Sequence, residues 1–324
     1  MNPTAASAIA TRVAIGADLG GTKVAVGVVD AEQRVLGRWQ APSAGLDRET
    51  LLARIEDLLA SALEAHPEAG AIGLGLPCAI DHERGVARSA VNLPLADVPI
   101  RDRLTERLGV PVFLDNDANV AALAEHRFGA ARGTRNAVML TLGTGVGGGV
   151  VIDGELFRGR GAAPEIGHIV VDADGPPCQG TCPNHGCIEA LASGSAIGRE
   201  ARRAAEAHPE SALGRALAAG EPVDGKAVTE AALAGDEIAR GVLELVGTRL
   251  GVALATLANM FSPDVFVVGG GAAAAGDLLL DPARTELARR ALSPHDEIPV
   301  VLAELGAEAG VIGAAALALE GERA

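Results

Sequence analysis

Short runs of aliphatic residues alternate along this chain with stretches in which apolar residues recur at helical spacing. Residues 13–30 are predicted as two strands that flank a tight glycine turn, because β-branched and small apolar residues lie on both sides of Gly20-Gly21. Leu51 and Ile55 belong to a recurrence that predicts a helix over 47–65, which His66-Pro67 ends.

The same two patterns continue to the carboxyl end. Strands are predicted at 34–39, 71–77, 110–114, on both sides of a second glycine turn within 136–153, and at 264–268. Helices are predicted at 100–108, 120–128, 190–219, 227–260 and 308–319. We expect the last helix to fold back on the amino-terminal domain. Since no run of about 18 apolar residues is free of glycine and charge, no membrane span is predicted.

Two of the glycine turns are similar in sequence. A shift of about 123 positions places Leu19 on Leu142, Gly20 on Gly143 and Val28 on Val151. Both copies have the order strand, glycine turn, strand. We therefore predict two similar domains that face one nucleotide across a cleft.

Two better-known phosphate motifs do not explain these turns. The run from Gly16 to Lys23 resembles a P-loop, and Gly143-x-Gly145-x-x-Gly148 matches the dinucleotide fingerprint. Both motifs require a helix after the glycines, whereas each turn here is followed by a predicted strand. The first turn can instead offer backbone N–H groups and the Thr22 hydroxyl to phosphate oxygens, with Asp18 at its mouth for a metal.

A third group of glycines follows the strand predicted at 264–268. Gly269, Gly270 and Gly271 have no side chains, so a flat base or a ribose could approach the backbone closely.

Polar residues follow the strand predicted at 110–114. Asp115, Asn116, Asp117 and Asn119 come at its carboxyl end, where open α/β sheets bind ligands. The alternative is that one of them caps the next helix. A single cap would account for one of these four residues, which favours a substrate site.

The stretch 164–189 contains His168, three of the four cysteines and the carboxylates Glu165 and Glu189. A histidine and three cysteines form a complete tetrahedral set for a structural zinc ion. The alternative is a zinc knuckle or disulfide loop with no role in an active site, but three cysteines cannot all pair internally. Glu165 and His168 are three positions apart, so they would share a face on a helical turn.

Composition narrows the class of protein. The chain has 324 residues, is 48% hydrophobic with 42 glycines but only 2% aromatic, and so must build its core from Ala, Val, Leu and Ile. This suits an α/β protein with close helix–sheet packing. The net charge of −15 argues against nucleic-acid binding, which needs a basic surface.

The amino end has no charged segment followed by an apolar one, so no signal peptide is expected and the cytoplasm is the predicted location. A reducing compartment favours metal thiolates over disulfides. Cys78, among apolar neighbours, is predicted to be a core thiol and not a nucleophile.

Together these segments resemble the ROK family of sugar kinases and sugar-responsive repressors, over residues 13–319. The resemblance implies the two-domain actin/hexokinase-like (ribonuclease H-like) ATPase fold with an interdomain cleft. We expect one α/β domain at 1–117 plus 306–324 and a second at 118–305. The motifs that carry the resemblance are Asp18-Leu-Gly-Gly-Thr-Lys23, Asn116-Asp117-Ala-Asn119, Leu142-Gly-Thr-Gly-Val-Gly-Gly-Gly149, Glu165-Ile-Gly-His168, Cys182-x4-Cys187-x-Glu189 and Val268-Gly-Gly-Gly271.

The resemblance also implies residue roles. Asp117 would be the general base, and Asp18 would hold Mg²⁺ directly or through water. The hexose would be bound by Asn92, Asn116, Asp117, Glu165, His168 and Glu189. ATP would lie against Asp18, Gly20, Gly21, Thr22, Lys23, Gly143, Thr144, Gly145, Gly269, Gly270 and Gly271. Structural Zn²⁺ would be held by His168, Cys178, Cys182 and Cys187, although relatives commonly have Cys-x-Cys where this chain has Cys178-x3-Cys182.

The activity implied is ATP-dependent phosphorylation of a hexose at its 6-hydroxyl, with glucose favoured and a homodimer expected. N-acetylglucosamine, N-acetylmannosamine, mannose and fructose are alternative substrates, and polyphosphate is an alternative donor. A sugar-responsive transcriptional regulator is the other class in the family. It would need a helix-turn-helix domain ahead of Asp18, and only 17 residues precede Asp18.

Overall fold

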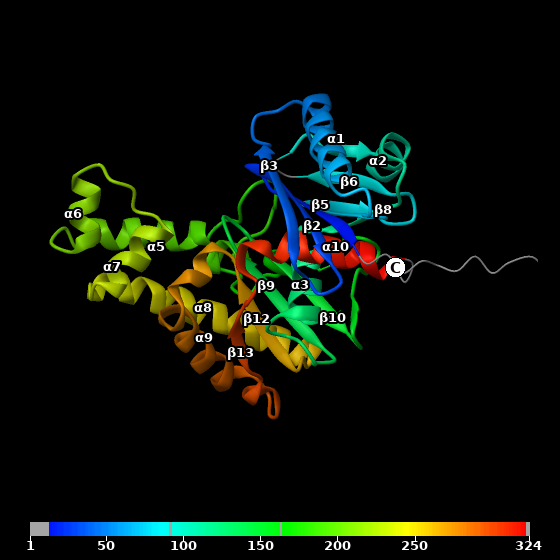
Figure 1. Cartoon of the computed structure of the whole chain (residues 1–324). Helices are drawn as coiled ribbons and strands as arrows, with labels where there is room; N and C mark the ends of the chain where they lie inside the picture. The colour runs from blue at the N-terminus through cyan, green and yellow to red at the C-terminus, as the bar shows by residue number, and fades with distance from the viewer. Residues whose placement is uncertain (1–12, 91–92, 163, 322–324) are drawn as a thin grey trace, which may run out of the picture. The chain divides into compact units, whose positions relative to one another are not determined.

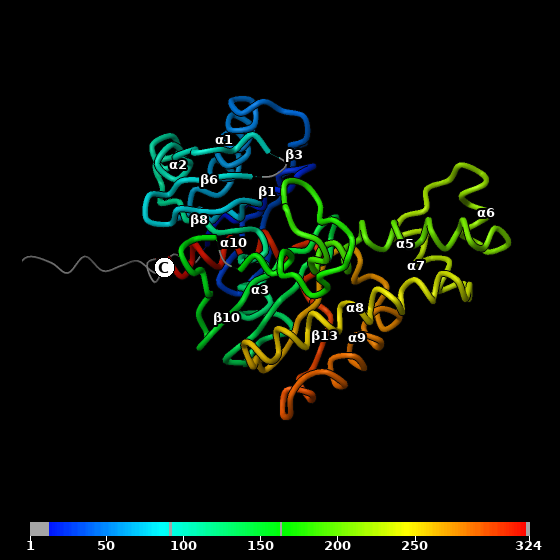
Figure 2. The backbone as a smooth tube through the Cα atoms, turned by 180° about the vertical axis from the view of Figure 1, so that it is seen from behind, coloured from blue at the N-terminus to red at the C-terminus, as the bar shows by residue number. Residues whose placement is uncertain are grey.

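The computed structural model describes residues 13–90, 93–162 and 164–321, and the chain divides into two compact units. Unit 1 comprises Met1–Ala124 with Glu308–Ala324, and unit 2 comprises Glu125–Ala307. The first boundary lies inside helix α3 (Asp117–Phe128), some residues beyond the position expected from sequence. Each unit has its own five-stranded sheet (Figures 1 and 2).

The sheet of unit 1 has the order β3-β2-β1-β4-β8. The strands are β1 (Val13–Leu19), β2 (Lys23–Asp30), β3 (Val35–Pro42), β4 (Ile72–Leu76) and β8 (Val112–Asn116). β1, β4 and β8 are parallel, whereas β2 and β3 are antiparallel to their neighbours. The predicted strands are all present.

Helices cover both faces of this sheet. Since side chains alternate along each strand, each strand contributes apolar side chains to both faces. Ile15 and Ala17 share a core with Leu51 and Ile55 of α1 (Arg48–Ala65). Ala14 packs on the opposite side, in a core that includes residues of α10 (Ala309–Glu320). Figure 1 shows α1 on one side of the strands and α10 on the other.

Glycines allow α10 to lie directly on the sheet. A Cβ at Gly16 of β1 would overlap the carbonyl of Val311, and one at Gly73 of β4 would overlap that of Ala314. The predicted return of the final helix to the amino-terminal unit is therefore confirmed. Since α10 covers the face that even-numbered residues of β1 point to, Asp18 belongs to this face as well.

A small three-stranded sheet in unit 1 was not predicted. It consists of β5 (Cys78–Asp81), β6 (Val86–Ala90) and β7 (Ala96–Val98), and is followed by helix α2 (Ile100–Leu108). Arg88 crosses it to bind Asp81 at 3.1 Å and Asp97 at 2.9 Å. These strands are short and carry charges, so they lack the apolar alternation that marks a strand in sequence.

The sheet of unit 2 repeats the topology of unit 1, with the order β11-β10-β9-β12-β13. Its strands are β9 (Ala137–Leu142), β10 (Val146–Ile152), β11 (Glu155–Leu156), β12 (Val265–Gly269) and β13 (Val300–Leu302). β9, β12 and β13 are parallel and β10 is antiparallel to β9, as for β1, β4, β8 and β2. The internal repeat inferred from the two glycine turns is confirmed at the level of topology.

The helical part of unit 2 is more divided than predicted. The stretch 190–219 forms α4 (Ile188–Ala192), α5 (Gly194–Ala207) and α6 (Ala212–Ala218), and 227–260 forms α7 (Gly225–Leu233) and α8 (Glu237–Phe261). Ser193, Ser211 and Asp236 cap the new amino ends by accepting backbone N–H groups. Helix α9 (Asp277–Arg290) and β13 were also missed.

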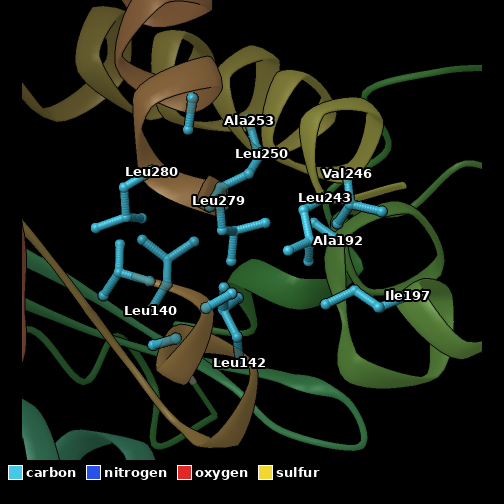
Figure 3. Packing of buried hydrophobic residues seen from close by; sticks show 14 of the residues in the cluster. Leu140, Leu142, Ala192, Ile197, Leu243, Val246, Leu250, Ala253, Leu279 and Leu280 are labelled. Carbon is cyan, nitrogen blue, oxygen red and sulfur yellow. The ribbon is translucent and has the colours of Figure 1, made fainter. Parts of the chain in front are cut away.

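Figure 3 shows the core of unit 2, where Leu140 and Leu142 of β9 lie near Leu250 of α8 and Leu279 of α9. Of the helices in the described ranges, α8 alone is long and apolar enough by composition to cross a membrane. Most of its apolar side chains pack in or beside this core, because twelve of its residues are buried, whereas Leu245 and Met260 are exposed. The apolar composition of α8 is thus explained by packing within unit 2.

Candidate functional site

The cysteine loop, residues 169–187, lies between a short 3₁₀ turn and helix α4 in unit 2. The turn η1 (Ile166–His168) begins after Glu165, whose carbonyl accepts the His168 N–H at 3.1 Å. Within the loop, Cys178 N donates to Asn184 O and Val171 N to Gly186 O, each at 2.9 Å. Gly186 has a φ of +61°, and a Cβ there would overlap the carbonyl of Asp172, so only glycine fits this bend.

The four predicted metal ligands converge at the end of this loop. One donor atom from each of His168, Cys178, Cys182 and Cys187 lies within 4.8 Å of all the others. The His168 Nδ1 is 3.5 Å from the Cys178 Sγ, and the Cys182 and Cys187 Sγ atoms are 3.9 Å apart.

These separations fit zinc. Tetrahedral Zn–S and Zn–N bonds of about 2.3 and 2.0 Å place ligand atoms about 3.5–3.8 Å from each other. All four cysteines of the chain are free, and the remaining one, Cys78, is buried in unit 1. The donor set and its spacing therefore suit a structural zinc site. None of the four cysteines of the chain is paired in a disulfide.

The predicted sugar ligands of unit 2 belong to this cluster or to the segments that carry it. Glu165 is exposed and His168 is partly exposed, with the Nδ1 of His168 directed toward the cysteines. Glu189, in the first turn of α4, links two parts of the unit. Its Oε2 accepts the Val146 N–H at 3.0 Å, and its Oε1 is 3.8 Å from the Cys178 Sγ.

The second turn, residues 143–145 between β9 and β10, is closely supported. The Gly143 carbonyl accepts the Gly194 N–H, and the Thr144 carbonyl accepts the Ser195 hydroxyl, both at 2.8 Å. A Cβ at Gly145 would overlap the Glu189 carboxylate.

The glycines 269–271 lie at the same edge of the sheet as the second turn. Gly269 pairs with Thr141 across the parallel strands β12 and β9. Gly270 has a φ of +86°, and a Cβ there would collide with the backbone of Leu142. The two predicted nucleotide segments of unit 2 are thus brought together.

The first turn, residues 20–22 between β1 and β2, has less support. The Gly20 N–H donates to the Lys23 carbonyl at 2.9 Å. Ser43, which is 1% exposed, donates its hydroxyl to the Gly20 carbonyl at 2.7 Å and its N–H to the Thr22 carbonyl at 3.0 Å. Gly21 has open space around it.

The polar cluster at the end of β8 and the start of α3 contains both a helix cap and candidate ligands. The Asn116 Oδ1 accepts the N–H groups of Ala118 at 2.9 Å and Asn119 at 3.3 Å, so Asn116 caps α3. Asp115 is buried and accepts the Asn119 side-chain amide at 2.9 Å. Asp117 is the first residue of α3 and is partly exposed.

Asp18 and Asp117 are neighbours in unit 1. Asp18, Gly75 and Asp115 occupy one level of the sheet, and Gly75 has no side chain to separate β1 from the start of α3. Burial raises the pKa of Asp18 from 3.8 to about 6, with the negative charge of Asp117 adding to the shift and Lys23 opposing it. A cation between such carboxylates would relieve this cost.

Cys78 is also close to this site. Burial and, to a smaller extent, the charge of Asp117 raise the pKa of the Cys78 thiol to about 12. A thiol that stays protonated is a poor nucleophile, which agrees with the predicted core role.

Several supporting residues were not found from the sequence. Ser43 at the first turn and Ser195 at the second belong to no motif. Gln179 donates to the Thr144 carbonyl at 3.2 Å, and the only sequence signal for it is its place in the expanded Cys178-x3-Cys182 spacing. Asn92, predicted to contact the sugar, lies outside the described residues.

Comparison with known proteins finds relatives that match nearly the whole chain. The profile of the ROK family matches residues 14–321. A glucokinase from Streptomyces coelicolor is 39% identical over 315 residues, covering 94% of this chain and 97% of that protein. A glucokinase from Thermotoga maritima is 37% identical over 310 residues, with the same coverage of both chains.

Solved structures give the same result. A ROK family glucokinase from Streptomyces griseus, in complex with glucose and AMPPNP, has a TM-score of 0.84 and 39% identity, with coverage of 95% of this chain and 100% of that one. A ROK hexokinase from Thermus thermophilus has a TM-score of 0.75 and 39% identity, with coverage of 94% of this chain and 97% of that one. These likenesses confirm the predicted two-domain actin/hexokinase-like fold, and the chain belongs to the ROK family.

Proposed function

We propose that this protein is a sugar kinase that transfers the γ-phosphoryl group of ATP to the 6-hydroxyl of a hexose, with glucose as the preferred acceptor. The observation that carries the proposal is the pair Asp18 and Asp117, whose charges are close enough to interact. Phosphoryl transfer to a hydroxyl requires one carboxylate that binds the metal ion and, beside it, a second carboxylate that accepts the proton of the hydroxyl. The glucokinase relatives and the glucose and AMPPNP complex support this choice of substrates.

Each carboxylate of the pair has a role in the proposal. Asp117, at the amino end of α3, would accept the proton of the attacking hydroxyl. Asp18 would hold Mg²⁺ directly or through water, and Mg²⁺ would neutralise charge on the phosphates. The ionised form of Asp18, which burial disfavours, would be restored by the metal.

The other hydroxyls of the hexose would be bound by polar side chains, namely Asn92, Asn116, Glu165, His168 and Glu189. Zinc on the Nδ1 of His168 would fix the tautomer of the ring and present Nε2 to the sugar. The zinc ion itself would be structural, because four protein ligands leave no open position.

The phosphate groups of ATP would bind the two glycine turns, residues 20–22 and 143–145. Their tight backbone offers N–H groups without side chains that block a ligand. Lys23 begins β2 directly after the first turn and adds positive charge near Asp18. Gly269, Gly270 and Gly271 would line the adenosine pocket.

The Asp117→Asn variant tests the assigned base. Its kcat should fall by at least about a hundredfold, since a general base contributes about 10²–10⁴ to the rate. Glucose affinity, measured by calorimetry, should stay within about threefold, since the amide keeps the size of the side chain and its ability to accept a hydrogen bond.

The matched control is Asp57→Asn, an exposed carboxylate on α1, which should leave both values unchanged. A kcat near that of the unsubstituted protein in Asp117→Asn would refute the role of Asp117.

Substrate choice is tested by a coupled phosphorylation assay with glucose, N-acetylglucosamine, N-acetylmannosamine, mannose and fructose, each with ATP and with polyphosphate. We expect glucose with ATP to give the highest kcat/KM, because several relatives at 37–39% identity are glucokinases. A higher kcat/KM for another hexose would correct the substrate, and no turnover of any sugar would refute the kinase activity. We also propose that the protein forms a homodimer and is located in the cytoplasm. Sedimentation analysis would measure the oligomeric state.

A further inference from the structure

We propose that Gln179, in the cysteine loop, is a positioning residue for the second turn, so that the metal-binding loop orients the phosphate donor as well as the sugar. The proposal deepens the proposed function, because it takes ATP phosphates to be the ligand of residues 143–145. All the residues involved belong to unit 2.

Gln179 connects the cysteine loop to the tip of the second turn. Its side-chain amide donates to the Thr144 carbonyl at 3.2 Å and to the Ser193 hydroxyl at 3.3 Å. The Thr144 carbonyl also accepts the Ser195 hydroxyl at 2.8 Å. Because Thr144 is exposed and Ser193 is fully buried, Gln179 ties a surface turn to a fixed point in the core.

These bonds determine where the turn's N–H groups point. In a planar trans peptide the C=O of one residue and the N–H of the next point in opposite directions. Holding the Thr144 carbonyl toward the loop therefore directs the Gly145 N–H away from it. The Gly143 carbonyl is held in the same way by the Gly194 N–H at 2.8 Å, which directs the Thr144 N–H. Two successive N–H groups fixed in this manner can form an anion-binding nest.

Metal binding would in turn fix Gln179. Its neighbour Cys178 is one of the metal ligands, and its own carbonyl accepts the N–H of Cys182, a second ligand, at 3.4 Å. Glu189 provides a parallel link, since it follows the ligand Cys187 by two residues and its carboxylate accepts the Val146 N–H at 3.0 Å. The second turn is thus held from the cysteine loop at both Thr144 and Val146.

The test is nucleotide affinity in Gln179→Ala, measured on the full chain by calorimetry with Mg²⁺ and a non-hydrolysable ATP analogue. We expect affinity to fall about three- to tenfold, the loss that corresponds to one or two intramolecular hydrogen bonds. Zinc content should stay at that of the unsubstituted protein, and glucose affinity within about twofold. In steady-state kinetics the KM for ATP should rise while the KM for glucose does not.

Two further variants make the result specific. Thr181→Ala removes an exposed side chain of the same loop and should leave nucleotide affinity unchanged. Gln179→Glu keeps the shape of the side chain but replaces the amide donor by a carboxylate that faces the Thr144 carbonyl. It should weaken nucleotide binding at least as much as Gln179→Ala.

Three outcomes would overturn the proposal: unchanged nucleotide affinity in both Gln179 variants, an equal loss of glucose affinity, or loss of zinc in both variants. Failure of the proposed function would look different. It would appear as no hexose turnover by the unsubstituted protein, whereas calorimetry reports the effect of Gln179 on nucleotide binding without any turnover.

Discussion

The two glycine turns are alike in sequence and in backbone topology, but they differ in what holds them. The first turn, residues 20–22, is held by one buried serine, Ser43, and has open space around Gly21. The second turn, residues 143–145, is held by Gln179, Ser195 and the backbone of Gly194. The Glu189 carboxylate fills the space beside Gly145.

The two copies of the repeated motif are therefore held in place by different parts of the structure. The second turn is held by a loop that a metal would order, whereas among the described residues the first turn is held by its own sheet and by Ser43 after β3. The strands also differ at the position before the shared Leu-Gly, where Asp18 of β1 corresponds to Thr141 of β9. At this position, therefore, the first copy has a carboxylate whose pKa is raised by burial, whereas the second copy has a hydroxyl.

The largest effect should come from removing the metal. If zinc is present about 100-fold above its dissociation constant, chelation should lower the free energy of unfolding by roughly 3 kcal/mol. Amide hydrogen exchange should accelerate at Val146 and the second turn, because the metal would no longer hold Cys178 next to Gln179 or Cys187 near Glu189. Exchange at residues 20–23 should not change.

Zinc added back after chelation is the control, and it should restore both the stability and the exchange rates. Equal acceleration at the two turns would show that the cysteine loop does not distinguish them.

A smaller effect should come from adding a methyl group to each turn. In Gly145→Ala the new Cβ would displace the Glu189 carboxylate, so kcat/KM for ATP should fall by about tenfold and thermal stability should fall as well. In Gly21→Ala the new Cβ meets no protein atom, so thermal stability should be unchanged. Thermal melts and steady-state kinetics on both variants measure the contrast.

The Gly21→Ala variant also tests the ligand. If its kcat/KM for ATP falls while its stability does not, the lost activity reports a close approach of the phosphates to the first turn. Destabilisation of Gly21→Ala as large as that of Gly145→Ala would contradict the difference in packing.

The smallest effect concerns Asp18 and pH. Its pKa is raised in the folded protein, from 3.8 to about 6, so ionisation of Asp18 lowers stability as the pH rises through this window. A shift of two units corresponds to about 3 kcal/mol, and partial solvent exposure reduces the expectation to about 1 kcal/mol.

Without metal, Asp18→Asn should therefore be more stable than the unsubstituted protein by about 1 kcal/mol at pH 8, measured by denaturant unfolding. The difference should shrink below pH 6 and vanish near pH 3.8. Thr141→Val, at the corresponding position of the second copy, is the control and should give a difference that does not depend on pH. An advantage of Asp18→Asn that grows toward low pH would refute the raised pKa.

Elements with strong periodicity were predicted well, and elements that depend on capping or charge were not. The strands of both hairpins and the helices α1, α2, α3 and α10 appear where the apolar pattern placed them. The break in the stretch 190–219 at Ser193 was missed, because a serine inside an Ala-rich run is a cap only when the chain bends there. β5, β6 and β7 were missed because their stability comes from pairing across the small sheet and from Arg88.

At the site, the residue types and their spacing were enough to predict the cluster of His168 and three cysteines that the structure brings together, because these residues make up a complete zinc ligand set within one short stretch. The amino-acid sequence also determined the repeat of strand, turn and strand, since local periodicity and glycine content encode it. Only the tertiary structure decided that Glu189 and Gln179 hold the second turn while Ser43 holds the first. These are hydrogen bonds between segments far apart in the chain, and their partners are chosen by packing of the whole unit, which no local pattern records.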